Sequence, residues 1–316
     1  MKKTWPFLLL PLLLACSCGP GAAGKHNDAG IRHVTVSVLP QQYFVKRIVG
    51  NEYQINVMIP PGQNEATYEP TPREMKAVGD SIIYFRIGHL AFEEAWIDKI
   101  TSLNPHMKIV DTSEGISLIT GTDLHSHHEE SETPRAGAGD HDHSGVDPHI
   151  WLSPAAVKIQ AKHILDAFME VEKDAIKRAA YEKNFNQFMQ DINALNSEIE
   201  ALLKPIPNKK FMVYHPAWAY FARDYGLTQY PIEMEGKSPS AAVMKEIVDT
   251  ARLENIRVIF VQQQFDAANA WAVANEIKGK VVTADPLAPD WLDNMRKTAH
   301  TFKEALETEY GRDNGK

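Results

Sequence analysis

Histidines are distributed unevenly along this chain, and their grouping marks where a metal ion could bind. Residues 113–147 are rich in Gly, Ser, Glu, Asp and His and show neither helical nor strand periodicity, which predicts a solvated loop. Neutral imidazole is a good ligand for Zn²⁺, so such a loop can capture the ion without a preformed site; a spacer with no role for its histidines is the alternative. The candidate auxiliary ligands are His125, His127, His128, His141 and His143.

Three further residues stand at the ends of predicted elements, where distant parts of a chain can meet. His149 precedes a predicted helix, His215 ends one predicted strand and Asp285 ends another. Ligands of open α/β sheets bind beyond the carboxyl ends of the strands, so the two strand-end residues can face one cleft. Taken singly, each residue also has an ordinary structural explanation, such as a turn at Asp285 before Pro286.

The chain has two cysteines, and both lie close to its N-terminus, so the remainder can hold neither a disulfide nor a thiolate metal site. Lys2 and Lys3 precede an apolar run that has the layout of a secretory signal and is too short to span a bilayer. The end of this run resembles a bacterial lipobox, which predicts lipidation of Cys16, with Cys18 as a second candidate. A cleaved signal without lipidation is the alternative. We therefore expect residues 1–30 to comprise the signal, the lipobox and a Gly- and Ala-rich tether.

Length and composition are typical of a globular protein with two domains. The chain has 316 residues, of which 44% are hydrophobic and 23% are charged, so it can bury a sizeable core. Its formal net charge is −8, and no basic stripe interleaved with aromatic residues offsets this charge. Such a surface would repel phosphate backbones, which argues against a nucleic-acid partner.

Short β-type runs alternate with helical stretches after the tether, as expected for α/β lobes with mainly parallel sheets. We predict an N-terminal lobe over 31–171 and a C-terminal lobe over 205–316. Thr71 followed by Pro72 indicates the start of a helix. Strands are predicted at 34–39, 53–59, 81–87, 107–112, 211–215, 257–262 and 280–285. Helices are predicted at 41–50, 72–79, 90–103, 217–225, 239–254 and 266–277.

The segment over 172–204 has a helical stripe of apolar residues that includes Phe188, Ile192 and Leu195, and Pro205 stops it. A helix of this length would measure roughly 50 Å at 1.5 Å per residue. We expect it to link the two lobes. A coiled-coil dimer seam is the alternative, but the stripe is short for one, so a monomer is predicted.

Six sequence segments resemble motifs of one known family. They are PPGQNEATYEPTP (60–72), DPHIWLSP (147–154), YHPAWAYFARDYGL (214–227), EGKSPSA (235–241), RVIFVQQQF (257–265) and TADPL (283–287). Together they resemble the zinc and manganese class of ABC-transporter solute-binding proteins, the ZnuA type, from about residue 34 to 308. The segments around His149 and His215 are the most specific.

The resemblance implies that His149, His215 and Asp285 are metal ligands between two lobes. Two imidazoles and one carboxylate suit a nearly tetrahedral Zn²⁺ site with one further position to fill. Manganese-selective relatives usually have a carboxylate at the position of His215, so the second nitrogen favours zinc, and Mn²⁺ is the less favoured ion.

The chain departs from the family pattern at Ala66, where relatives normally have a histidine ligand. Its neighbour Glu65 could supply a carboxylate oxygen instead. Water, or a histidine of the 113–147 loop, could also fill this position. The departure is expected to weaken or retune metal binding.

The resemblance implies an exported protein, held at a membrane by its lipid anchor, that captures Zn²⁺ and delivers it to an ABC-transporter permease. The chain lacks a Gly-x-Ser-x-Gly segment, a phosphate-binding Gly-rich loop and a His-Glu-x-x-His pair, so we do not expect an enzyme. One alternative is a zinc-dependent hydrolase of the cell envelope with Glu65 as its general base. Another is an envelope adhesin that a metal ion stabilises.

Overall fold

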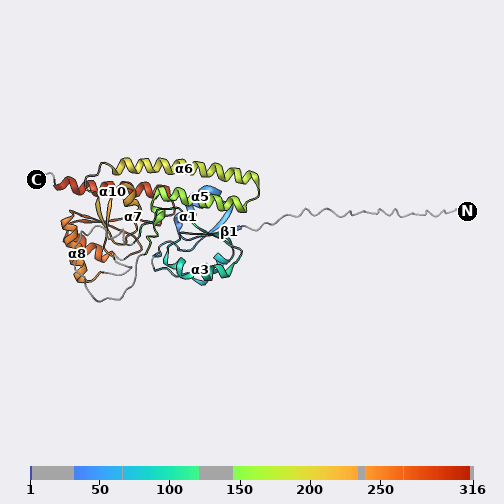
Figure 1. Ribbon diagram of the computed structural model, residues 1–316, viewed down its shortest axis with the longest axis horizontal. Helices are drawn as coiled ribbons and strands as arrows, with labels where there is room; N and C mark the ends of the chain where they lie inside the picture. Colours follow the sequence, from blue (N-terminus) through green and yellow to red (C-terminus); the bar gives the residue numbers. More distant parts are fainter. Residues whose placement is uncertain (2–31, 66, 121–144, 234–238, 266, 314–316) are drawn as a thin grey trace. The chain divides into compact units, whose positions relative to one another are not determined.

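Two parallel β-sheets form the framework of the protein in a computed structural model that describes residues 1, 32–65, 67–120, 145–233, 239–265 and 267–313 (Figure 1). Met1–Gly30 and Ile31–Lys316 are separate units, and the description that follows concerns the second. Cys16 and the five histidines of the predicted auxiliary loop lie outside the described residues. No helix of the described part is both long and apolar enough to cross a membrane.

The first lobe is built on a four-stranded sheet with the order β2-β1-β3-β4. All its strand pairs are parallel, as the alternation of strands and helices predicts. Its strands are β1 (Arg32–Val36), β2 (Tyr53–Val57), β3 (Ser81–Arg86) and β4 (Lys108–Asp111). Its helices are α1 (Leu39–Val49), α2 (Pro72–Gly79), α3 (Ala91–Leu103) and α5 (Pro154–Val171), the last preceded by the short helix η1 (Ile150–Leu152).

The second lobe repeats this arrangement with a four-stranded parallel sheet of order β6-β5-β7-β8. Its strands are β5 (Lys210–Val213), β6 (Thr228–Pro231), β7 (Val258–Val261) and β8 (Lys280–Thr283). Its helices are α7 (Ala219–Tyr225), α8 (Ala241–Leu253), α9 (Ala268–Glu276) and α10 (Trp291–Asp313). The predicted fold class of two α/β lobes with parallel sheets is confirmed.

Helix α6 (Ala175–Leu203) is the linking helix that the apolar stripe predicts. It begins a few residues later than expected, because the Asp174 side chain accepts hydrogen bonds from the backbone N–H groups of Ile176 and Lys177 and so caps the helix. Its 29 residues correspond to about 43 Å at 1.5 Å per residue. It packs against α1 and α5 in the first lobe and against α10 and α7 in the second, so it spans both lobes (Figure 1).

An aromatic cluster joins the lobes under α6. Phe188 of α6 lies 6.0 Å from the ring of Phe44 on α1 and 6.4 Å from the ring of Trp291 on α10, measured between centroids. Phe44 and Trp291 contact each other edge to face at 5.3 Å. All three side chains are fully buried, so one continuous core holds elements of both lobes.

Two elements had no sequence prediction. Strand β6 is the four residues Thr-Gln-Tyr-Pro, which are too few and too polar to show alternation, and only pairing with β5 makes them a strand. Helix α10 was missed although its buried residues, which include Met295, Ala299 and Phe302, recur at steps of three and four along the sequence. Only β6 owes its identification to tertiary contacts.

Candidate metal centre

Three buried side chains with metal-ligating atoms meet between the two lobes. They are Glu65, His149 and His215, with 2%, 4% and 8% of their surface exposed. One ligand atom from each lies within 4.8 Å of the others. The two Nε2 atoms are 3.3 Å apart, and Glu65 Oε1 lies 3.5 Å from His149 Nε2 and 3.6 Å from His215 Nε2. This is the one such cluster in the described part of the chain.

His149 and His215 lie next to regular elements, whereas Glu65 lies within a loop. Glu65 lies in the connection between β2 and α2, and His149 directly precedes η1. His215 follows β5, where the backbone N–H of Tyr214 donates to Phe260 O of β7 at 2.9 Å. The predicted strand 211–215 therefore ends two residues early, and His215 lies in the turn beyond the carboxyl end of the sheet, where ligand-binding residues of this fold class gather.

Two further carboxylates hold the imidazoles from behind. Asp147 Oδ1 accepts from the backbone N–H of His149 and contacts its Nδ1, both at 2.8 Å. Glu233 Oε1 lies 3.1 Å from Nδ1 of His215. A carboxylate accepts hydrogen bonds, so each Nδ1 carries the proton it donates and each Nε2 is directed toward Glu65 and the other ring. Sequence reasoning missed both carboxylates, although Asp147 stands two residues before His149.

Aromatic rings pack against the two imidazoles. The ring of Phe265 stacks on His215 with a centroid separation of 4.8 Å and an interplanar angle of 17°. Trp151 lies 5.2 Å from His149, and its indole N–H donates to Pro286 O at 2.8 Å. These contacts restrict the rotation of both imidazoles and exclude solvent from the site.

Carboxylates and imidazoles at the site shift the pKa values of His149 and Glu65. Burial lowers the pKa of His149, but the carboxylates of Asp147 and Glu65 outweigh it and raise that pKa to about 9. Burial raises the pKa of Glu65, but the imidazoles of His149 and His215 outweigh it, so the net pKa lies below the ordinary value. Without a metal ion, His149 is therefore an imidazolium beside the Glu65 carboxylate at neutral pH. A cation that binds Nε2 of His149 must displace a proton.

The Glu65 carboxylate fits a metal ligand better than a structural group. Both of its oxygens are buried, and neither has a hydrogen-bond partner in the described part of the protein. A buried carboxylate without hydrogen bonds is costly to maintain, and this cost is offset by the imidazolium of His149, 3.5 Å from Oε1, whose place a bound cation would take. Oxygen from Glu65 and nitrogen from the two imidazoles together form a donor set that suits Zn²⁺.

The carboxylate of Asp285 does not belong to this cluster. Its Oδ1 accepts from the backbone N–H of Leu287 at 2.9 Å, as expected of a turn residue, and its backbone oxygen accepts from Asn294 at 2.7 Å. The bond from Trp151 to Pro286 holds this turn against the His149 segment. Asp285 as a metal ligand remains a prediction.

One protein family matches most of the chain. The sequence model described as zinc-uptake complex component A, periplasmic, matches residues 34–305, which is most of the chain. The chain belongs to this family of zinc-uptake components. Members of the family are solute-binding parts of transport systems rather than enzymes, so the hydrolase alternative is set aside.

Individual relatives of the zinc-uptake family agree with this assignment. The high-affinity zinc uptake system protein ZnuA of Bacillus subtilis is 28% identical, with 97% of this chain and 99% of the relative covered. The zinc-binding lipoprotein AdcA of Streptococcus pneumoniae is 27% identical over 94% of this chain and 59% of its own length. A crystal structure of ZnuA superposes with a TM-score of 0.77 at 37% identity, covering 88% of this chain and all of that structure.

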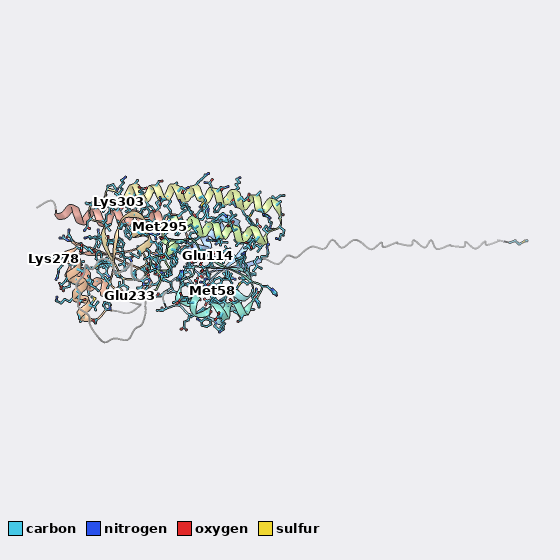
Figure 2. The ribbon with its side chains drawn as sticks, in the orientation of Figure 1. Met58, Glu114, Glu233, Lys278, Met295 and Lys303 are labelled. Atoms are coloured by element: carbon cyan, nitrogen blue, oxygen red, sulfur yellow. The ribbon has the colours of Figure 1, made fainter. Side chains whose placement is uncertain are left out.

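A substitution of Glu233, labelled in Figure 2, tests whether the carboxylates that contact the Nδ1 atoms of the histidines strengthen metal binding. We expect Glu233→Gln to weaken zinc binding about tenfold, because a neutral amide holds the Nδ1 proton of His215 less firmly and makes Nε2 a poorer ligand. The affinity is measured by competition with a chromophoric chelator at pH 7. The exposed Glu246→Gln on α8 is the matched control, and equal affinities of the two variants would show that Glu233 has no influence on the site.

Proposed function

We propose that this protein captures Zn²⁺ between its lobes and delivers it to the permease of an ABC transporter. The observation that carries the proposal is the convergence of Glu65, His149 and His215 from both lobes. The Glu65 oxygens form no hydrogen bond in the described part of the chain, and the Nε2 atoms of both histidines face them. Both imidazoles are already oriented by carboxylates, so zinc binding would require little rearrangement of the rings.

The ligand set that we propose consists of His149, His215, Glu65 and Asp285. Glu65 takes the place of the histidine that relatives have at the position of Ala66. Asp285 supplies the fourth ligand after its carboxylate exchanges the N–H of Leu287 for the ion. Two nitrogens and two carboxylate oxygens give a neutral site, and the two imidazoles favour Zn²⁺ over the harder Mn²⁺.

The family and the N-terminal segment support a proposal for the cellular setting. Periplasmic zinc-uptake components work outside the cytoplasm, and a related zinc-binding protein is a lipoprotein. We propose that this chain is exported, lipidated at Cys16 and held at a membrane surface as a monomer. The histidines of the 113–147 loop act as auxiliary zinc ligands that raise the local metal concentration.

Titration calorimetry with zinc and manganese tests the proposal. The unaltered protein is compared with a variant in which a four-residue Gly-Ser linker replaces residues 121–144, which lie between Thr120 and Gly145. We expect one tight zinc site per chain in both proteins and weaker manganese binding. Loss of all tight zinc binding in the linker variant would instead place the main site on the loop histidines. No tight zinc binding by the unaltered protein would overturn the proposed function.

A further inference from the structure

We propose that the hydroxyl of Tyr220 is a positioning group that sets the distance between His149 and His215. Tyr220 lies on α7 in the second lobe and touches none of the three clustered ligand residues through its hydroxyl. The inference rests on the proposed function and concerns a residue that would act on the zinc site through other groups.

The Tyr220 hydroxyl joins two separate segments of the first lobe. It donates to the backbone oxygen of Asp147 at 2.8 Å and accepts from the backbone N–H of Ile119 at 3.1 Å. The same two residues are joined directly, because the N–H of Asp147 donates to the Ile119 oxygen at 2.9 Å. Thr120 and Val146 extend this contact as an antiparallel bridge. The hydroxyl thus closes a small ring of hydrogen bonds at the point where 117–120 and 145–149 meet.

This ring leads directly to His149. Asp147, whose backbone oxygen accepts from Tyr220, holds both the backbone N–H and the Nδ1 of His149 with its carboxylate. A displacement of the Asp147 backbone would therefore move the imidazole with it. Tyr220 fixes that backbone from the opposite lobe.

The same tyrosine is tied to His215 through its own helix. Helix α7 begins four residues after His215, and the N–H of Ala217 donates to the His215 oxygen at 2.8 Å, so the turn and the helix are continuous. Tyr220 is therefore anchored to one ligand through the chain and to the other through Asp147. The hydroxyl therefore connects the segments of the two ligands through Asp147.

Other contacts hold α7 against the first lobe and allow the hydroxyl to be tested alone. Arg223 lies 4.9 Å from the centroid of the Tyr220 ring and donates to Ser117 O at 2.7 Å. Asp224 accepts a hydrogen bond from the hydroxyl of Ser153. Tyr220→Phe keeps the buried ring and these contacts, so we expect the helix to stay docked while the spacing of the ligands is released.

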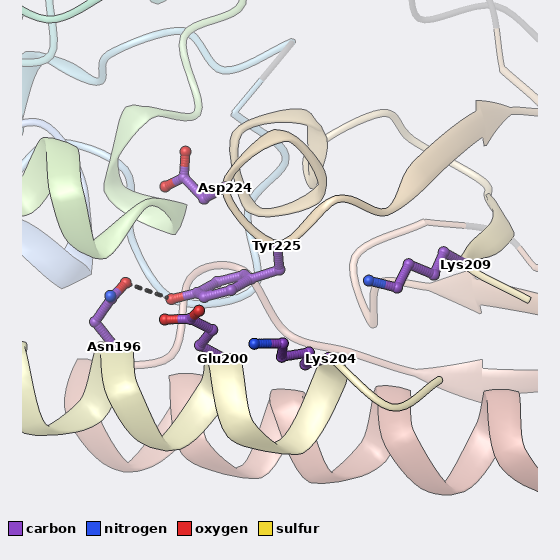
Figure 3. Close-up of a pocket in the computed structure, with 6 residues that line it drawn as sticks. All are labelled: Asn196, Glu200, Lys204, Lys209, Asp224 and Tyr225. Atoms are coloured by element: carbon purple, nitrogen blue, oxygen red, sulfur yellow. Dashed lines mark hydrogen bonds between the residues drawn. The ribbon is translucent and has the colours of Figure 1, made fainter. Parts of the chain in front are cut away.

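Tyr225 provides a matched control on the same helix. Its hydroxyl donates to Asn196 Oδ1 of α6 at 2.9 Å, beside a polar pocket that contains none of the clustered ligand residues (Figure 3). Tyr220 and Tyr225 are both buried, with 0% and 8% of their surface exposed. Each loses a buried hydroxyl on substitution by phenylalanine, so a general effect on stability should appear in both variants.

The experiment compares the unaltered full chain with Tyr220→Phe and Tyr225→Phe by chelator competition at pH 7. We expect Tyr220→Phe to weaken zinc binding about fivefold, below the range for a residue that touches a ligand, and Tyr225→Phe to leave the affinity unchanged. The visible absorption of bound Co²⁺ should shift in Tyr220→Phe alone, because it reports the ligand geometry. Equal affinities and spectra in the two variants would overturn the inference, whereas failure of the unaltered protein to bind zinc would overturn the proposed function and the inference with it.

Amide hydrogen exchange in the unaltered protein keeps the inference testable if Tyr220→Phe does not fold. Coupling between two sites is reciprocal. If the Tyr220 hydrogen bonds strengthen zinc binding, zinc binding must also strengthen these hydrogen bonds. We expect zinc to slow exchange at the Ile119 amide more than at the Met107 amide, which donates to Asn104 in a turn of the same lobe. Equal slowing at the two amides would overturn the inference.

Discussion

Zinc binding by His215→Ala is expected to be about a hundredfold weaker than zinc binding by the unaltered protein. A complete set of four ligands binds structural zinc with about 10–16 kcal/mol, so one ligand accounts for about 3 kcal/mol, or about a hundredfold in affinity. The substitution also leaves the buried carboxylate of Glu233 without the Nδ1 partner that it has now. His149→Ala should lose a similar amount and leave Asp147 without its ring contact. Chelator competition at pH 7 measures both variants.

The control for these variants is His300→Ala on α10. His300 is half exposed, and its Nε2 lies 4.0 Å from Glu198. It is not part of the metal-ligating cluster of the described residues. We expect this substitution to leave zinc binding unchanged. Circular dichroism of the metal-free variants should show that each is folded. If His215→Ala bound zinc as tightly as His300→Ala, the site would have to lie elsewhere in the chain.

Glu65→Gln is expected to weaken zinc binding about thirtyfold. An amide oxygen is neutral and a poorer ligand for a dication, so the substitution first costs about as much binding free energy as the loss of a histidine ligand. Part of this loss is offset, because the Glu65 carboxylate also helps to raise the pKa of His149. Without the carboxylate, the proton that zinc must displace leaves His149 more readily. The measurement is the same competition at pH 7.

Glu69→Gln is the matched control for this prediction, because Glu69 is exposed and lies in the same connection before α2. We expect it to bind zinc as the unaltered protein does. If Glu65→Gln matched this control, the first lobe would contribute no carboxylate ligand. Water or a histidine of the 113–147 loop would then fill the position, as the sequence leaves open. Asp285→Asn in the same series shows whether the turn carboxylate binds zinc.

Elements with local signals were predicted closely from the sequence. Helix α2 begins at Pro72 as expected, because Thr71 accepts from the Glu74 backbone N–H at 3.4 Å and the Glu74 side chain accepts from the Thr71 N–H at 2.7 Å. All of these partners lie within one helical turn of each other. The predicted stripe of α6 is also local, since it depends only on steps of three and four residues. Strand β6 carries no such signal and was missed.

The sequence by itself determined the residue types of the proposed zinc site and the segments that carry them. His149 and His215 were assigned from distinctive segments, and Glu65 from its position beside Ala66, but no local rule states that these three residues meet. Their side chains converge because α6 and the aromatic cluster around Phe188 hold both sheets in one core. Hydrogen bonds and packing act between atoms that are close in space, whatever their separation along the chain. Only the tertiary structure therefore decided that Glu233 supports His215 and that the hydroxyl of Tyr220 reaches Asp147.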